Sequence, residues 1–144
     1  MSVYIAKTAK VEGNAKVEGN AKVEGKAEVR GIVSGNAIVR DKAMVEDFPI
    51  VCGSAIIEGD AHICGGATIE GNAKVQGRAY VRANAVVRGN AMVFGDAWVC
   101  GGVIVKGNVR MSGNAYVYGD TILEGCVTIS SGILNDVHWW RDIP

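Results

Sequence analysis

The 144-residue sequence predicts an all-β solenoid, in which short strands joined by tight corners stack as successive parallel coils. Aliphatic residues that recur every six positions, from Ile5 to Ile129, are the first observation behind this prediction. The second is that glycine stands two positions after most of these anchors and alanine four positions after most of them. The third is that no 3.6-residue periodicity of a helix competes with this pattern.

Each hexad is expected to form one short strand and one corner. Alternate side chains of a strand point to opposite faces, so the alanine and the aliphatic anchor of an Ala-x-Val segment share the inner face. Pairs such as Gly13-Asn14 and Gly119-Asp120 supply the positive φ angle that a tight corner requires. Because a strand this short cannot bury its apolar face alone, copies of it must stack.

Two places depart from the hexad. The anchors Val29 and Val33 are four positions apart, so two corner residues are missing between them. At residues 46–49, Glu-Asp-Phe-Pro replaces the usual corner sequence. We therefore expect two irregular corners in an otherwise regular solenoid, which has no long insertion between its hexads.

The hexad aliphatic-x-Gly-Asn-Ala-x resembles that of the hexapeptide-repeat proteins, which include bacterial-type hexapeptide transferase-like proteins, over residues 5–134. The resemblance implies a single-stranded left-handed parallel β-helix, a triangular prism of about seven coils with three hexapeptides each. Left-handed coiling is an exception to the rule for parallel crossovers, and a right-handed solenoid like that of the bactofilins is the alternative. We expect residues 1–134 to form the β-helix, and residues 135–144 to be a C-terminal tail that caps it or begins a further segment.

Composition and charge narrow the classes of function. Fifteen basic and fifteen acidic residues cancel, so there is no electrostatic reason to expect nucleic acid or an anionic membrane as partner. No stretch approaches the roughly 20 apolar residues of a membrane-spanning helix, and the N-terminus lacks the apolar core of a secretory signal. Four cysteines without CxxC spacing suit a reducing compartment. We expect a cytoplasmic protein.

The residue before each anchor is predicted to point outward, and residues 18 apart are predicted to stack in columns. The first column is Ile32, Ile50, Thr68, Val86, Ile104 and Ile122. The second is Ile38, Ile56, Lys74, Met92, Arg110 and Thr128. The third is Met44, His62, Tyr80, Trp98, Tyr116 and Leu134. The corresponding residues of the N-terminal hexads are charged instead, which predicts a solvated surface there.

A long outward apolar column on a protein usually marks an interface. The sequence therefore predicts a non-enzymatic structural or interaction solenoid that forms a homodimer or homotrimer and needs no cofactor. The predicted interface residues are Ile32, Ile50, Val86, Ile104, Ile122, Met44, Tyr80, Trp98 and Tyr116. The competing explanation is that β-propensity alone places Ile and Val on exposed strands.

The resemblance also implies an enzymatic alternative. The family includes acyltransferases that bind CoA-type donors in grooves between adjacent prisms, many with a histidine as general base. Under this alternative, His62 would be the base and acetyl-CoA the donor. The γ-class carbonic anhydrases share the fold but hold zinc with three histidines. Only His62 and His138 are present here, so we expect no metal site.

Two further columns carry reactive or charged groups. Cys64, Arg82 and Cys100 follow their anchors in one column. The two thiols are two coils, or about 10 Å, apart, which is too far for a disulfide within one chain, and the arginine between them would favour a thiolate. A corner column contains Asp60, Asp96 and Asn114. We interpret it as a solvated polar ladder rather than a calcium site.

Overall fold

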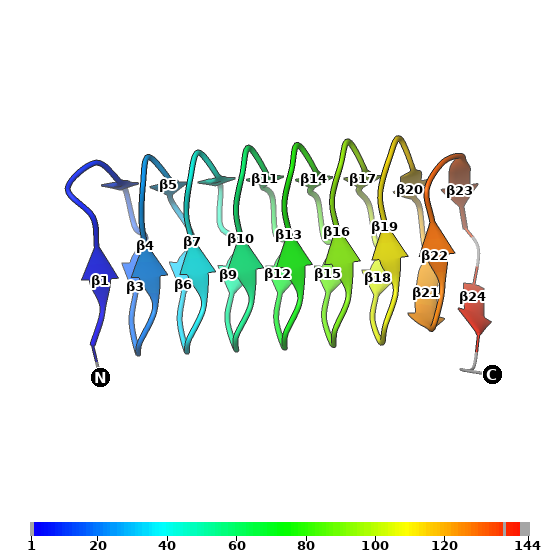
Figure 1. Cartoon of the computed structure of the whole chain (residues 1–144), viewed down its shortest axis with the longest axis horizontal. Helices are drawn as coiled ribbons and strands as arrows, with labels where there is room; N and C mark the ends of the chain where they lie inside the picture. Colours follow the sequence, from blue (N-terminus) through cyan, green and yellow to red (C-terminus); the bar gives the residue numbers. More distant parts are fainter. Residues whose placement is uncertain (1, 137, 142–144) are drawn as a thin grey trace.

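Short parallel strands and tight corners alternate along the chain. The computed structural model describes residues 2–136 and 138–141. Its strands form three parallel sheets of eight strands each, and the chain visits the three sheets in turn (Figure 1). The described residues contain no helix, and therefore none long and apolar enough to cross a membrane. The predicted fold is confirmed: an all-β left-handed parallel β-helix, shaped as a triangular prism of about seven coils.

Each coil contributes one strand to each of three faces, named A, B and C. Face A consists of β1 (Tyr4–Ile5), β4 (Lys22–Val23), β7 (Ile38–Val39), β10 (Ile56–Ile57), β13 (Lys74–Val75), β16 (Met92–Val93), β19 (Arg110–Met111) and β22 (Thr128–Ile129). Face B consists of β2 (Lys10–Val11), β5 (Glu28–Val29), β8 (Met44–Val45), β11 (His62–Ile63), β14 (Tyr80–Val81), β17 (Trp98–Val99), β20 (Tyr116–Tyr118) and β23 (Ile133–Asn135). Face C consists of β3 (Lys16–Val17), β6 (Ile32–Val33), β9 (Ile50–Val51), β12 (Thr68–Ile69), β15 (Val86–Val87), β18 (Ile104–Val105), β21 (Ile122–Gly125) and β24 (His138–Arg141).

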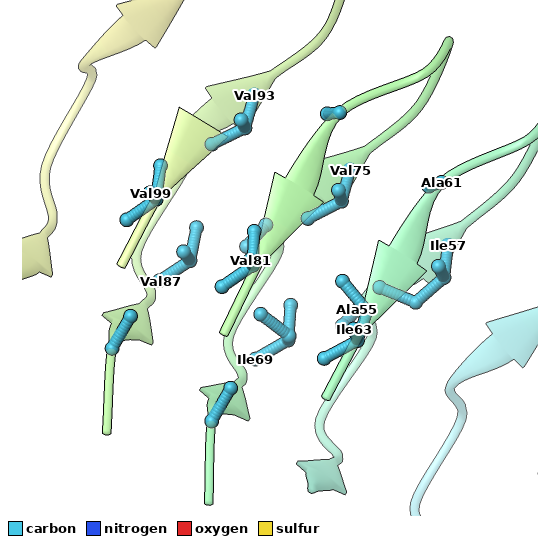
Figure 2. Close-up of a cluster of buried hydrophobic side chains, with 14 of the residues drawn as sticks. Ala55, Ile57, Ala61, Ile63, Ile69, Val75, Val81, Val87, Val93 and Val99 are labelled. Atoms are coloured by element: carbon cyan, nitrogen blue, oxygen red, sulfur yellow. The ribbon is translucent and has the colours of Figure 1, made fainter. Parts of the chain in front are cut away.

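The inward residues of the hexads form one continuous core. The hydrophobic residues among them are completely buried from Ala21 to Leu123. Ile57, Ile63 and Ile69, one from each face, point into the same interior (Figure 2). Burying one such side chain stabilises the fold by about 1.5–3 kcal/mol. The core therefore holds the three sheets together, while the side chains between the inward positions remain on the surface.

Positive φ angles recur at the corners, two positions after the anchors. Gly71 has φ 68°, and a Cβ atom there would lie 2.9 Å from the backbone nitrogen of Gly89 in the next coil. Aspartate replaces glycine in three corners. The carboxylates of Asp41 and Asp47 accept hydrogen bonds from backbone N–H groups of the next coil, at 3.0 and 3.1 Å, and that of Asp136 accepts one from the N–H of Asp120 in the preceding coil, at 2.9 Å. Ala83 has φ 63° but no side-chain acceptor. It is therefore a strained corner residue.

The two irregular corners are neighbours in adjacent coils. Gly31 lies at the shortened corner, and Pro49 lies in the irregular corner of the next coil. The backbone oxygen of Pro49 accepts a hydrogen bond from the N–H of Ile32 at 2.9 Å. A Cβ atom on Gly31 would overlap this oxygen, so only glycine fits beneath the proline. The two predicted irregularities are thus one local feature of the fold.

The last coil corrects the sequence assignment of one outward residue. Ile133, not Leu134, pairs with Tyr116, because the preceding corner is one residue short. Ile133 is 70% exposed, whereas Leu134 packs against the core. A shift of one position moves every side chain of a strand to the opposite face. Beyond this point, β24 pairs with β21, so strand pairing continues into residues that the sequence analysis assigned to the tail.

Candidate interaction faces

Face C presents an almost purely aliphatic outward column. The pairing of its strands places Ile32, Ile50, Thr68, Val86, Ile104 and Ile122 beside one another in that order. Most of these side chains are half-buried by their neighbours in the column, and Ile50 is 40% exposed. The column therefore lies where the sequence predicted it.

A charged column lies beside the aliphatic one on the same face. It consists of the residues that follow the inward anchors: Glu70, Arg88, Lys106 and Glu124. The Nζ atom of Lys106 is 3.0 Å from Oε2 of Glu124. The structure shows no ion pair between Glu70 or Arg88 and any other described residue. Sequence reasoning missed this column because, among the residues that follow the anchors, it considered only the column with the cysteines of face B. The same 18-residue spacing would have revealed it.

The charge of Glu70 also acts on its neighbour in this column. Burial raises the pKa of the Cys52 thiol, and the carboxylate of Glu70 raises this pKa further. Cys52 and Glu70 follow the inward anchors of two paired strands and are therefore neighbours in this column. Towards the N-terminal end of face C, the same column continues with Ser34 and Glu18.

Face B presents stacked aromatic rings. The ring centroids of His62 and Tyr80 are 4.5 Å apart, those of Tyr80 and Trp98 are 4.7 Å apart, and those of Trp98 and Tyr116 are 5.7 Å apart. The guanidinium group of Arg82 lies 5.6 Å from the centroid of Tyr80 and 5.2 Å from that of Trp98. Each such aromatic pair contributes about 0.5–1.5 kcal/mol beyond its area burial. The ring faces are thus occupied by neighbouring side chains of the same molecule.

His62 stands at the N-terminal end of this aromatic stack. Its Nε2 atom is in hydrogen-bonding contact with Oε1 of Glu46, and the imidazole is 21% exposed. Glu46 belongs to the irregular corner. The sequence analysis did not predict its contact with His62, because the two residues lie in adjacent columns rather than in the same one. The arrangement is an imidazole oriented by a carboxylate, on an open face. The described residues enclose no pocket.

The cysteine column on face B differs from the prediction in its electrostatics. Burial raises the pKa of the Cys64 thiol, and the charges of Asp47 and Glu46 raise it further, against an opposing effect of Arg82. Arg82 thus acts in the predicted direction and lowers the pKa of the Cys64 thiol, but burial and the two carboxylates outweigh it, so the net pKa is raised. The Sγ atom of Cys100 lies 3.8 Å from the hydroxyl oxygen of Tyr116. All four cysteines are free thiols.

Ion pairs occur on face A and at its corner. On the face, the Arg40 guanidinium contacts Oε1 of Glu58 through Nε at 3.0 Å and Nη2 at 2.6 Å. In the corner column, Arg78 lies between Asp60 and Asp96, and its Nε is 2.9 Å from Oδ1 of Asp96. No group of three potential metal ligands occurs among the described residues. The aspartates of this corner therefore belong to a ladder of alternating charge.

No protein-family model and no curated protein sequence matches this chain. The three faces are therefore interpreted from their own chemistry. Face A mixes apolar and charged outward residues and contains the ion pair of Arg40 with Glu58, face B stacks internally through its rings, and face C presents an aliphatic column interrupted by Thr68.

Proposed function

We propose that this chain is a non-enzymatic structural and interaction solenoid of the hexapeptide-repeat type, which associates with copies of itself through face C. The observation that carries the proposal is the outward aliphatic column from Ile32 to Ile122, which extends over six successive strands of one face. Removing apolar surface from water stabilises an association by about 25 cal/mol per Å². A continuous column of this kind favours a partner surface rather than water.

β-Propensity alone does not account for the column. If propensity set the outward residues, all coils would carry Ile or Val at this position. The first coils instead carry lysine at the equivalent positions, namely Lys10, Lys16 and Lys22. The same strand geometry therefore accepts charged residues, and the change on face C from Lys16 to mainly aliphatic residues from β6 onward calls for a different reason. Association of that part of the prism supplies one.

Face C is a better candidate for the primary interface than face B. The predicted interface residues Tyr80, Trp98 and Tyr116 already stack on one another and on Arg82, so a partner would gain mainly their ring edges. Met44 lies in the same outward column, one strand before His62. Together, Met44, Tyr80, Trp98 and Tyr116 remain a predicted second contact surface.

The test is the oligomeric state of the intact chain. Sedimentation equilibrium at micromolar to submillimolar concentrations should show a dimer or trimer for the unmodified protein and a monomer for Ile104→Lys. Met92→Lys, on face A and equally half-buried, is the matched control and should associate like the unmodified protein. A monomer of the unmodified chain, or full association of Ile104→Lys, would contradict the proposal. Circular dichroism verifies that both variants are folded.

We further propose a cytoplasmic location. Its support is that all four cysteines are free thiols, as is usual for proteins of reducing compartments.

A second candidate function is the acyltransferase activity that the resemblance implies. The observation in its favour is the contact between His62 and Glu46, because a carboxylate-oriented imidazole is a common general base. Calorimetry with acetyl-CoA tests it. Saturable binding that is lost in His62→Ala and kept in Lys74→Ala would support this candidate, and the absence of binding would exclude acetyl-CoA as the donor.

A further inference from the structure

We infer that two copies associate through face C in antiparallel orientation, about a two-fold axis that runs parallel to the strands between β12 and β15. In this arrangement, Glu70 of each copy faces Arg88 of the other. The inference rests on the proposed function and adds the partner, its orientation and its register.

Face C has the regularity that such a match requires. Its aliphatic and charged columns run side by side along the prism, with one residue of each column on every strand. Neighbouring strands are about 4.8 Å apart. Since both copies have this same spacing, columns that match on one strand match on all of them.

The chemistry of the two columns selects the orientation. A two-fold axis along the prism would place the aliphatic column of one copy on the charged column of the other, with Val86 against Arg88 and Ile104 against Lys106. Burying charged groups against apolar ones without compensating partners is costly. An axis parallel to the strands places aliphatic on aliphatic and charged on charged. The antiparallel arrangement is therefore favoured when the two faces overlap fully.

The sequence of charges along the column selects the register. With the axis between β12 and β15, Ile32 faces Ile122, Ile50 faces Ile104, and Thr68 faces Val86. In the charged column, Glu70 faces Arg88, and the symmetry forms this pair twice. Neither residue has an ion-pair partner among the described residues of its own chain. Each would gain one from the second copy.

Neighbouring registers are less favourable. If the axis passes through the strand level of Glu70, the two Glu70 side chains of the dimer face each other. If it passes through the level of Arg88, the two Arg88 side chains face each other. An axis one strand further towards the C-terminus places Arg88 opposite Lys106 and Glu70 opposite Glu124. Like charges that face each other across an interface suppress association. An axis one strand towards the N-terminus places Glu18 opposite Lys106, but it also places Lys16 on Ile104 and leaves Ile122 without an aliphatic residue opposite it. Among these registers, the proposed one alone pairs opposite charges at its centre and keeps the whole column from Ile32 to Ile122 facing itself.

The other charges of the column fit this register. Lys106 contacts Glu124 of its own chain at 3.0 Å and faces Cys52 of the second copy. Glu124 faces Ser34.

A face about 34 Å long and about 15 Å wide covers about 500 Å² per copy, so the contact is near the lower limit for a specific interface. The dimer is expected to be weak, and the experiments require high protein concentration.

Charge reversal tests the pairing between molecules. Glu70→Arg alone and Arg88→Glu alone each place like charges opposite each other twice, so each variant should dimerise at least about tenfold more weakly than the unmodified chain. An equimolar mixture of the two variants restores both opposite-charge pairs and should dimerise within about threefold of the unmodified chain. Arg110→Glu, an exposed charge on face A, is the control and should dimerise normally.

The outcomes separate this inference from the proposed function. If the unmodified chain dimerises but the mixture stays monomeric, or if the single variants dimerise normally, the antiparallel register is wrong while association through face C stands. A trimer would also overturn the two-fold arrangement. A monomeric unmodified chain would overturn both.

Cross-linking provides a second measurement. In Lys106→Cys, a short bismaleimide should link the new thiol to native Cys52 of the second copy, which mass spectrometry identifies from the linked peptide. Ser34→Cys lies beside Cys52 of its own chain and four strand levels from Cys52 of the second copy in the proposed register. It should therefore link to Cys52 within one chain but give no covalent dimer through Cys52. An equal yield of Cys52-linked covalent dimer from both variants would contradict the register.

Discussion

The N-terminal coils and the middle coils share one interior but have different exteriors. In both regions, alanine and an aliphatic anchor point inward, and the corner glycines adopt the same backbone, with φ 64° at Gly13 and 68° at Gly71. On faces B and C, the outward residue before the anchor is lysine or glutamate in β2, β3 and β5, but mostly aliphatic or aromatic from β6 onward. The comparison teaches that interior and corners determine the coil, whereas the outward residues vary independently of it.

The two regions also differ in how completely the interior is enclosed. The inward anchor Ile5 of the first coil is 43% exposed, whereas Ile57, on the same face three strands further along, is completely buried. In a solenoid, each coil contacts only its neighbours. An anchor in the first coil therefore has neighbours on one side only, and stability should fall towards that end.

The largest expected effect comes from emptying equivalent core positions in the two regions. Ile57→Ala should lower the free energy of unfolding by about 3–5 kcal/mol, because it leaves a cavity between coils. Ile5→Ala should lower it by about 1 kcal/mol, because that side chain already contacts solvent. Urea denaturation of both variants, compared at equal m-values, measures the difference. Equal costs would mean that the first coil is as well enclosed as the middle.

A smaller difference is expected at the corners. Gly13→Ala should cost about 1 kcal/mol, because alanine is strained at positive φ, and a Cβ atom at Gly13 has no neighbour within 4 Å. Gly71→Ala should cost about 2–3 kcal/mol, since its Cβ atom also approaches the backbone of Gly89. The midpoints of urea denaturation compare the two variants. Indistinguishable midpoints would show that the next coil moves away without cost.

A gain is expected at the one corner where alanine has positive φ. All the corners of the N-terminal coils from residue 11 to 27 have glycine there, whereas the middle has Ala83 with φ 63°. Ala83→Gly should raise the free energy of unfolding by up to about 1 kcal/mol, because the strain exceeds the entropy that glycine loses. Ala85→Gly, at a buried inward position, is the control and should be destabilising. A loss of stability in Ala83→Gly would contradict this account of the corner.

The smallest effect concerns thiol reactivity on the middle exterior. Because the pKa of Cys64 is raised above its usual range, its thiolate should form, and its alkylation accelerate, at a higher pH than for an ordinary cysteine. Arg82→Ala removes the opposing positive charge, so the pH profile should move further upward. Iodoacetamide labelling of individual cysteines, followed by mass spectrometry across pH, measures this profile. A profile that moves downward in Arg82→Ala would refute the assigned cause.

The sequence alone determined the solenoid, its core and the members of the three outward columns before the anchors as far as Thr128. The six-residue repeat, together with the alternation of side chains in a strand, places Ala73 and Val75 on the inner face and Lys74 on the outer face. Stacking of identical units then fixes which residues are neighbours, because equal spacing repeats in every coil. This reasoning works wherever the count of residues per coil is constant.

Only the tertiary structure decided the features that depend on unequal corners or on contacts between columns. Register accumulates along a solenoid, so one residue fewer in a corner sufficed to exchange Leu134 for Ile133 at the surface. The contact of His62 with Glu46 joins two columns, and the balance of charges at Cys64 depends on burial as well as on Arg82. The six-residue repeat of the sequence predicts which residues share a column. Distances between side chains of adjacent columns also depend on rotamers and on the geometry of each corner, and the repeat does not predict these.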